Sequence, residues 1–286
     1  MQLHKVGDIA FCSRQESDLD YIRHIAQRVY ACYCGESSRW SLPKSDEIWS
    51  ISFGGRAGVL GVRIDGRVAC VKLFYDERLR TKLRVALGCS KGRRAYRNGV
   101  RLEEVGISCP RMLGYAERRP LGPAMIVTEL AEGYIRLDLW ALEHGAPRPI
   151  VLALARFIRD LHDRGVWHTD LSPRNILLDP SDANGRFVLL DYEDARFASN
   201  VSDRRRLDNL HHLHERVIGY VSLRDRLRFL RAYAPKERRT LRNTLRRMMR
   251  KSGTRWLQKH AYANTGPCPP SGPEQVTSAH ARRAEK

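Results

Sequence analysis

The chain has 286 residues, of which 42% are apolar and 8% aromatic, a composition that excludes a disordered protein and suffices for one two-lobed domain or two small ones. Lysine and arginine number 51 against 32 aspartates and glutamates, so the formal charge of +19 favours a polyanionic partner: nucleic acid, nucleotide phosphates or an anionic membrane surface. No apolar run approaches the roughly 20 residues of a membrane span, and seven cysteines lack zinc-ligand spacing, so we expect a cytoplasmic protein with reduced thiols.

Residues 1–45 are expected to form an N-terminal extension outside the main fold. Within this extension, residues 16–33 predict a helix, because apolar side chains recur on one side at helical spacing. These side chains are Leu19, Ile22, Ile25 and Val29. The proline-containing stretch at residues 41–46 then ends the helix.

Three antiparallel strands are predicted next, at residues 48–53, 57–64 and 67–75. Gly54 and Gly55 separate the first two strands, and the pair Asp65 and Gly66 is typical of the tight turn of a β-hairpin. The strand-rich pattern therefore begins with a three-stranded meander.

A helix at residues 90–105 follows, with Ser90 as its N-cap. Two further strands are predicted at residues 111–117 and 124–131. We therefore predict that residues 46–131 form a small lobe with an antiparallel sheet and one main helix.

The pattern of apolar residues then becomes helical, and we predict a larger helical lobe at residues 132–260. Residues 147–165 and 204–250 have helical patterns, and a strand at residues 186–191 lies between them. Residues 261–286 are rich in proline, glycine and serine and predict a flexible tail. A cleft between the two lobes is the expected ligand site.

The stretch HTDLSPRNILLD, at residues 168–179, carries the chemistry. Asp170 and Asn175 have the spacing of a catalytic carboxylate and a metal-binding amide, and Asp191 ends the strand that follows. Phosphoryl transfer needs one carboxylate that accepts a hydroxyl proton, and an amide oxygen and a second carboxylate that hold Mg²⁺. We therefore expect Asp170 to be the catalytic base, and Asn175 and Asp191 to be magnesium ligands.

Lys72 lies in a predicted strand between apolar neighbours, where its ammonium needs an opposite charge that the phosphates of ATP would supply. The glycines of the hairpin before it, among them Gly55 and Gly58, would let backbone approach those phosphates. Glu129 and Asn98 complete the set of residues that we expect to contribute to nucleotide binding.

In this order of glycine hairpin, strand lysine, helix, catalytic loop and metal aspartate, residues 50–200 resemble the protein-kinase-like superfamily. The stretches VWHTDLSPRNILLD and FVLLDYEDARF, with RRAYRNGVRLEEVGISCPRMLGY and DRLRFLRAY, are similar to the lipopolysaccharide core kinases, which phosphorylate heptose or 3-deoxy-octulosonate. The resemblance implies an α+β, bilobal protein-kinase-like fold. It also implies Lys72 at the nucleotide phosphates, Asp170 as base, Asn175 and Asp191 on Mg²⁺, and His168 as a brace for the loop.

The sequence departs from that pattern in two ways. Thr169 stands where many kinases have arginine, and Tyr192 and Glu193 follow Asp191 in place of Phe-Gly, which favours a small or glycolipid acceptor over a regulated protein. The partner of Lys72 also stays open. Asn98, Glu103 and Glu104 are the alternatives on the helix, and we favour Asn98 because it shares the inward stripe.

Basic residues gather at 236–260, where Leu241, Leu245 and Met249 can form an apolar ridge for docking to an anionic membrane. A solvated helical face is the alternative there, and it is also our interpretation of His162 and of the histidines at 211, 212 and 214. Nucleic acid is not favoured, because no recognised binding motif accompanies the charge.

The sequence predicts an ATP- and Mg²⁺-dependent kinase that phosphorylates a sugar hydroxyl of the lipopolysaccharide inner core, at the cytoplasmic face of the inner membrane. A kinase of the same fold acting on a protein, like the right-open-reading-frame (RIO) kinases, or on a small molecule such as an aminoglycoside, is one alternative. A catalytically silent module that binds membrane or nucleic acid is another.

Overall fold

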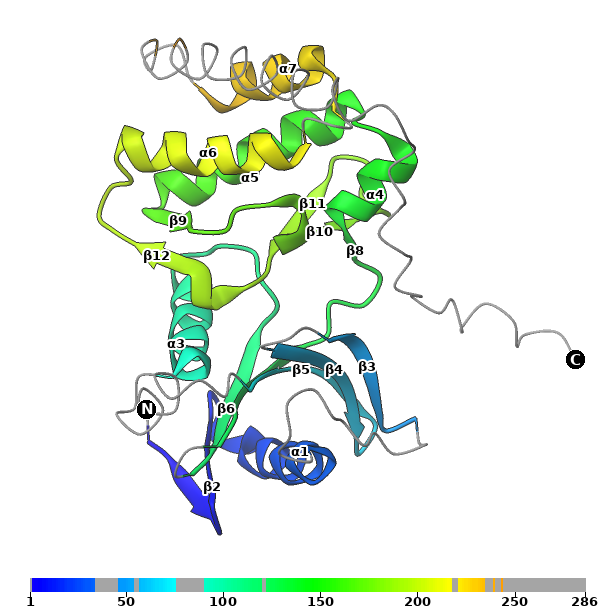
Figure 1. The fold of residues 1–286 in the computed structure, drawn as a ribbon, viewed down its shortest axis with the longest axis vertical. Coiled ribbons are helices and arrows are strands. Elements are labelled where there is room, and N and C mark those ends of the chain that lie inside the picture. Colours follow the sequence, from blue (N-terminus) through cyan, green and yellow to red (C-terminus); the bar gives the residue numbers. More distant parts are fainter. Residues whose placement is uncertain are drawn as a thin grey trace, which may run out of the picture.

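The structure is a computed structural model that describes residues 2–33, 46–53, 57–75, 90–119, 122–217 and 221–234, together with residues 239 and 243. Figure 1 shows a sheet-rich N-terminal half below a helix-rich C-terminal half. Basic residues 236–260 lie outside the described residues apart from 239 and 243, and the predicted tail lies wholly outside them.

A seven-stranded antiparallel sheet forms the N-terminal half, in the order β1-β2-β6-β7-β5-β4-β3. Its strands are β1 (His4–Val6), β2 (Ile9–Ser13), β3 (Ile48–Phe53), β4 (Ala57–Ile64), β5 (Arg67–Phe74), β6 (Met112–Arg118) and β7 (Ala124–Glu129). The predicted hairpin turn is confirmed, because Asp65 and Gly66 both have positive φ, 51° and 74°, as a tight two-residue turn requires.

Helix α1 (Leu19–Cys32), which follows the short 3-10 turn η1 (Glu16–Asp18), is where residues 16–33 predicted a helix. Ile22, Ile25 and Val29 are fully buried against the sheet. The expectation of a separate extension is wrong for the described part of residues 1–45, because β2 pairs with β6 and α1 shares a core with the sheet. The N-terminal half therefore has a second main helix.

Helix α3 (Lys91–Glu104) begins after Ser90, whose hydroxyl accepts a hydrogen bond from the backbone N–H of Arg93 at 3.0 Å. Its glycines bring it close to its neighbours: a Cβ on Gly92 would lie 2.9 Å from the Cβ of Ala124, and one on Gly99 would overlap Met112. Helix α3 therefore packs tightly against β6 and β7 and against the turn that follows Asp191.

The C-terminal half consists of short strands and longer helices. Its elements are β8 (Ile135–Arg136), α4 (Leu137–His144), α5 (Arg148–Asp163), β9 (Val166–His168), η2 (Pro173–Asn175), β10 (Ile176–Asp179), β11 (Arg186–Leu189), η3 (Tyr192–Asp194), β12 (Ala195–Phe197), α6 (Asp203–Val217) and α7 (Leu223–Tyr233). The helical pattern from residue 204 is divided between α6 and α7, and the hydroxyl of Ser222 caps α7.

One continuous apolar core joins the two halves. It combines side chains of β6, β7 and α3, such as Tyr115 and Leu102, with side chains of α5 and the strands around the catalytic loop, such as Ile158 and Ile176. The shared core fixes β5 relative to the loop that carries Asp170. Within the described residues, no helix has the length and hydrophobicity to cross a bilayer.

Candidate functional site

The loop that follows β9, which the sequence predicted to be catalytic, is anchored by Asn209 of α6. The buried Asn209 amide accepts a hydrogen bond from the backbone N–H of His168 at 3.0 Å and donates one to its carbonyl at 2.9 Å. The His168 ring is fully buried, and its Nε2 lies 2.9 Å from the backbone carbonyl of Asp191. His168 therefore braces the loop against the backbone of Asp191, the role that the resemblance implied.

Asp170 and Asn175 lie together at the two ends of this loop. The Asn175 amide nitrogen donates to the Asp170 carbonyl at 2.9 Å and to Oδ2 of its carboxylate at 3.2 Å. The Asn175 carbonyl in turn accepts from the backbone N–H of Leu190 at 2.9 Å, next to Asp191. Hydrogen bonds therefore connect Asp170 with Asn175, and the backbone of Asn175 with the residue that precedes Asp191.

Asp191 adopts the left-handed backbone conformation, with φ at 59°. Among the described residues other than glycine, Asp65 alone shares this feature. Such strain in a non-glycine residue is retained where surrounding structure enforces it, and often at functional sites. The change of chain direction at Asp191 ends the extended segment after β11, and η3 begins with the next residue. As a result, the carboxylates of Asp191 and Glu193 lie on the same side and both contact Lys72.

Lys72 of β5 contacts both acids. Its Nζ lies 2.6 Å from Oδ1 of Asp191 and 2.8 Å from Oε1 of Glu193. Burial disfavours the ammonium, but the two carboxylates outweigh that effect, Glu193 most, and raise the pKa of Lys72 above its ordinary value. Lys72 is therefore a permanent positive charge at the junction of the two halves.

The prediction that Asn98 of the helix is the partner of Lys72 is wrong. The Asn98 amide donates instead to the backbone carbonyls of Tyr192 at 2.7 Å and Ala195 at 3.0 Å, so it holds the turn that carries Glu193. Glu103 is occupied by Arg14 and by the N–H of Met112, and Glu104 is exposed. A carboxylate two positions after Asp191 thus takes the place expected for a residue of the helix.

Of the remaining residues predicted to bind the nucleotide, the structure describes Gly58 and Glu129, and Gly58 lies near Lys72. Gly55 lies outside the described residues, and Gly58 is buried in β4, next to Val59, which faces Lys72 across the strand pair. Glu129 is exposed at the end of β7, and its carboxylate pairs with Arg111 at 2.7 Å. The sheet therefore brings Gly58 near Lys72, while the side chain of Glu129 is engaged elsewhere.

Gly61 has a role that the sequence did not reveal. A Cβ at this position would overlap the indole ring of Trp49, which lies opposite on β3. This glycine of the hairpin therefore makes room for an aromatic side chain.

The expected solvated histidine face is wrong for three of the four histidines. His162 is fully buried between the hydroxyl of Tyr233 and the amide of Asn209, and His214 is also buried. His212 reaches the site itself, since its Nε2 lies 2.7 Å from Oδ1 of Asp170. Only His211 fits the expectation: it is 39% exposed, with Glu215 one turn away at 3.6 Å. The helical register of His214 with the apolar Leu210 was the available signal.

The donor set fits a hard cation. The Asn175 amide oxygen and the Asp191 carboxylate are oxygen ligands of the kind that Mg²⁺ prefers. In the described part of the chain, no group of three His, Cys, Asp or Glu side chains could hold a metal ion. Magnesium usually takes one or two protein carboxylates and completes its shell with phosphates and water, so a sparse set of this kind is suitable for it.

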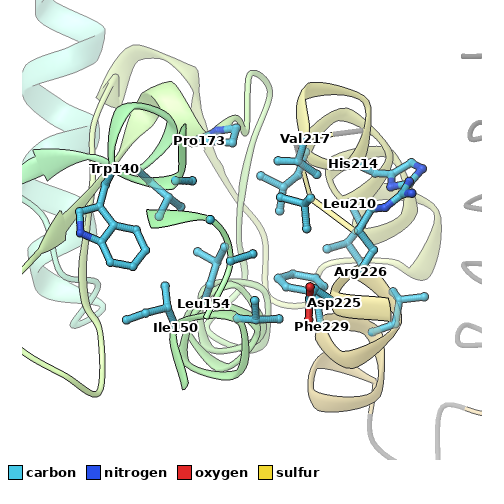
Figure 2. A pocket seen from close by; sticks show the side chains of 18 residues that line it. Trp140, Ile150, Leu154, Pro173, Leu210, His214, Val217, Asp225, Arg226 and Phe229 are labelled. Atoms are coloured by element: carbon cyan, nitrogen blue, oxygen red, sulfur yellow. The ribbon is translucent and has the colours of Figure 1, made fainter. Parts of the chain in front are cut away.

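An apolar pocket lies within the C-terminal half, among α4, α5, α6 and α7 (Figure 2). Figure 2 shows Trp140, Ile150 and Leu154 on one side of it, and Leu210 and Phe229 on the other. None of the predicted site residues lines this pocket. It is therefore distinct from the site between the halves, where the sequence predicted the ligand.

The sequence model described as "Lipopolysaccharide kinase (Kdo/WaaP) family" matches residues 54–233. The chain belongs to this family. Its matched region contains Lys72 and the catalytic loop, but not β1, β2 and α1.

Curated relatives carry the name 3-deoxy-D-manno-octulosonic acid kinase. The protein from Pasteurella multocida is 28% identical over 134 residues, which are 42% of this chain and 51% of the relative. The protein from Haemophilus influenzae is 28% identical over 130 residues, 43% of this chain and 53% of the relative. The chain thus matches about half the length of the curated relatives.

A solved structure of WaaP in complex with acyl carrier protein is also similar. It is 25% identical, with a TM-score of 0.53, over 77% of this chain and 88% of that chain. The bifunctional kinase-methyltransferase WbdD matches 68% of this chain at 19% identity and a TM-score of 0.44. With the sheet and helical halves observed here, the WaaP likeness confirms the expected bilobal kinase-like fold.

Proposed function

We propose that the protein transfers the γ-phosphoryl group of ATP to a sugar hydroxyl of the lipopolysaccharide inner core. The proposal rests on family membership together with one observation. Residues from three separate stretches, Lys72, the Asp170–Asn175 loop and Asp191 with Glu193, are linked by hydrogen bonds at the junction of the two halves. A lysine fixed beside two carboxylates and a loop carboxylate is the arrangement that phosphoryl transfer requires.

Each residue has a distinct part. Lys72 supplies a fixed positive charge for the nucleotide phosphates, and Glu193 holds its ammonium in place. Asp170, with its side chain 49% exposed, accepts the proton of the acceptor hydroxyl. Asn175 and Asp191 would hold Mg²⁺, which neutralises the charge of the phosphates when it is bound.

The acceptor that we propose is 3-deoxy-D-manno-octulosonic acid, because the curated relatives carry the names of kinases for this sugar. A lipid-linked acceptor would bring the enzyme to the cytoplasmic face of the inner membrane. The excess of basic residues would favour that anionic surface. The solved WaaP complex does not identify a sugar, so a heptose acceptor is the alternative to test.

The experiment combines purified protein, Mg²⁺, γ-labelled ATP and defined acceptors. We expect label transfer to 3-deoxy-octulosonate linked to lipid A, none with EDTA, and none with Asp170→Asn. Transfer only to a heptose-bearing core would replace the sugar, and transfer only to protein or an aminoglycoside would support those alternatives. Absence of any transfer from folded protein that still binds membranes or nucleic acid would support a silent binding module.

We also propose an acyl carrier protein as a partner, with the apolar pocket as the place for its acyl chain. WaaP was solved with such a carrier, and the pocket between α4 and α7 is lined mainly by apolar side chains, with His214, Asp225 and Arg226 beside them. Binding of an acylated but not of an unacylated carrier, weakened by Leu154→Asp, is the expected result. Equal binding of both carriers would exclude the pocket.

A further inference from the structure

His212 lies on α6, a helix that contacts both β9 and η2 at the two ends of the catalytic loop. Its Nε2 lies 2.7 Å from Oδ1 of Asp170, although the two residues are separated by 42 positions. The His212 side chain is 31% exposed, whereas its neighbours Leu210 and Leu213 are buried in the core. Helix α6 therefore has its packing residues on one side and presents His212 to the loop.

The chemistry of the contact fixes which group donates. An ionised carboxylate can only accept hydrogen bonds, so Nε2 of His212 must carry the hydrogen. Asp170 thus accepts from two elements: from His212 at Oδ1 and from the Asn175 amide at Oδ2, at 3.2 Å. Two donors at the two oxygens restrict rotation of the carboxylate about its terminal bond. A side chain that is half exposed would otherwise sample several orientations.

We propose that His212 is a positioning residue for the catalytic carboxylate. It holds Asp170 by Oδ1, so that Oδ2, which has a second lone pair besides the one facing the Asn175 amide, can receive the proton of the acceptor hydroxyl. In that step the O–H bond of the acceptor breaks, its proton passes to Asp170, its oxygen bonds to the γ-phosphorus, and ADP leaves with the electrons of the broken P–O bond. The inference rests on the proposed function, and it adds a residue outside the catalytic loop to the site.

A positioning role makes a specific demand on the side chain at 212. The side chain must donate one hydrogen bond from an atom as far from the backbone as Nε2 of histidine, and it does not have to exchange a proton. Glutamine can place an amide N–H at comparable reach, whereas alanine cannot. His211, the adjacent histidine on the same helix, contacts Glu215 and supplies a matched control.

The test compares His212→Ala, His212→Gln and His211→Ala in steady-state phosphoryl transfer and thermal unfolding. Loss of one hydrogen bond to a charged group predicts that His212→Ala lowers kcat roughly 10- to 100-fold. The KM for ATP and the Tm should change little, because no core residue is removed. His212→Gln should recover most of the kcat, and His211→Ala should match the wild type. A His212→Ala enzyme with wild-type kcat, or a folded His212→Gln enzyme as slow as His212→Ala, overturns the proposal.

A second measurement separates this inference from the proposed function. Nitrogen-15 spectra of the histidine rings should show the Nε2–H tautomer for His212, and Asp170→Asn should shift its signals while those of His211 stay unchanged. An unshifted His212 signal shows that the contact does not exist and overturns the inference alone. A wild-type enzyme that transfers no phosphoryl group to any acceptor overturns the proposed function, and the positioning role of His212 with it.

Discussion

Nζ of Lys72 lies 2.6 Å from Oδ1 of Asp191, so an ion pair between residues 119 positions apart joins the two halves of the molecule at the site. Glu193 contacts the same ammonium at 2.8 Å and is the more buried of the two acids, with 11% of its side chain exposed. Two carboxylates share the Lys72 ammonium, so Lys72 would keep Glu193 as its partner if Asp191 bound Mg²⁺. The predictions begin with this group.

Replacing Lys72 with methionine should affect catalysis more than folding. We expect kcat to fall roughly 10²- to 10³-fold, as for the loss of other charged groups that stabilise a transition state. Stability should fall by about 1–3 kcal/mol, because the buried carboxylate of Glu193 loses its charged partner. Kinetics and urea denaturation measure the two effects, with Lys5→Met on the exposed β1 as control. Full turnover by the variant would exclude Lys72 from the site.

Magnesium dependence should be altered by Asp191→Asn, which keeps the shape of the side chain but removes its charge. EDTA should abolish transfer by the wild type. The variant should need more Mg²⁺ for half-maximal activity and lose about 10²-fold in kcat, since a charged oxygen ligand has been replaced by a neutral one. Titration of activity with MgCl₂ measures this. Asp20→Asn, at a site with 79% exposure, is the control, and an identical Mg²⁺ requirement in both variants would contradict the assignment.

Asn209→Ala should destabilise the loop that carries Asp170. The substitution leaves the buried N–H and carbonyl of His168 without their partner, at 3.0 and 2.9 Å, and removes a contact to His162. Each buried polar group left unpaired costs about 1–3 kcal/mol, so a loss of about 2–4 kcal/mol is expected. Urea denaturation of Asn209→Ala beside Asp208→Ala, its exposed neighbour, measures the difference. Equal stability of the two variants would show that Asn209 does not anchor the loop.

His214 should make the fold sensitive to acid. Burial, followed by the charges of Arg226 and His211, lowers the pKa of His214 from 6.5 to about 4. Neither ring nitrogen has a hydrogen-bond partner among the described residues. Between pH 4 and 6.5 the unfolded state therefore binds more protons than the folded state, and stability rises with pH across that range.

The full contribution of His214 is present above pH 6.5, and acidification to pH 4 should remove on the order of 3 kcal/mol. His214→Leu has no such titration and suits the apolar pocket, so its stability should fall less between pH 6.5 and 4.5. Free energies of unfolding at several pH values test this. Parallel curves for wild type and variant would mean that His214 is not buried in its neutral form.

Local signals predicted much of the N-terminal half. The Asp65-Gly66 turn and the Ser90 cap are where the sequence placed them, because each depends on backbone geometry set by one or two residues. The contact between Asp170 and Asn175 also followed from spacing, since a short loop leaves little freedom for their relative positions.

Long-range contacts could not be predicted in this way. Glu193 reaches Lys72 only because Asp191 adopts a positive φ, which neighbouring sequence does not reveal. His212 reaches Asp170 because α6 packs against β9 and η2, an arrangement set by packing of the whole half. Pairing of β2 with β6 joins segments about a hundred residues apart, so neither β2 as part of the sheet nor α1 as part of its core could be recognised.

The pairing of β2 with β6 has a practical consequence for anyone who shortens this protein. A version trimmed to the family-matched residues 54–233 would lack β3 at one border and β1, β2 and α1 at the other. Its β6 would become an open edge beside the uncovered apolar surface that Ile22, Ile25 and Val29 now bury. Unpaired edges next to exposed apolar surface associate with one another. Such a fragment should therefore be recovered as aggregate, whatever catalytic residues it retains.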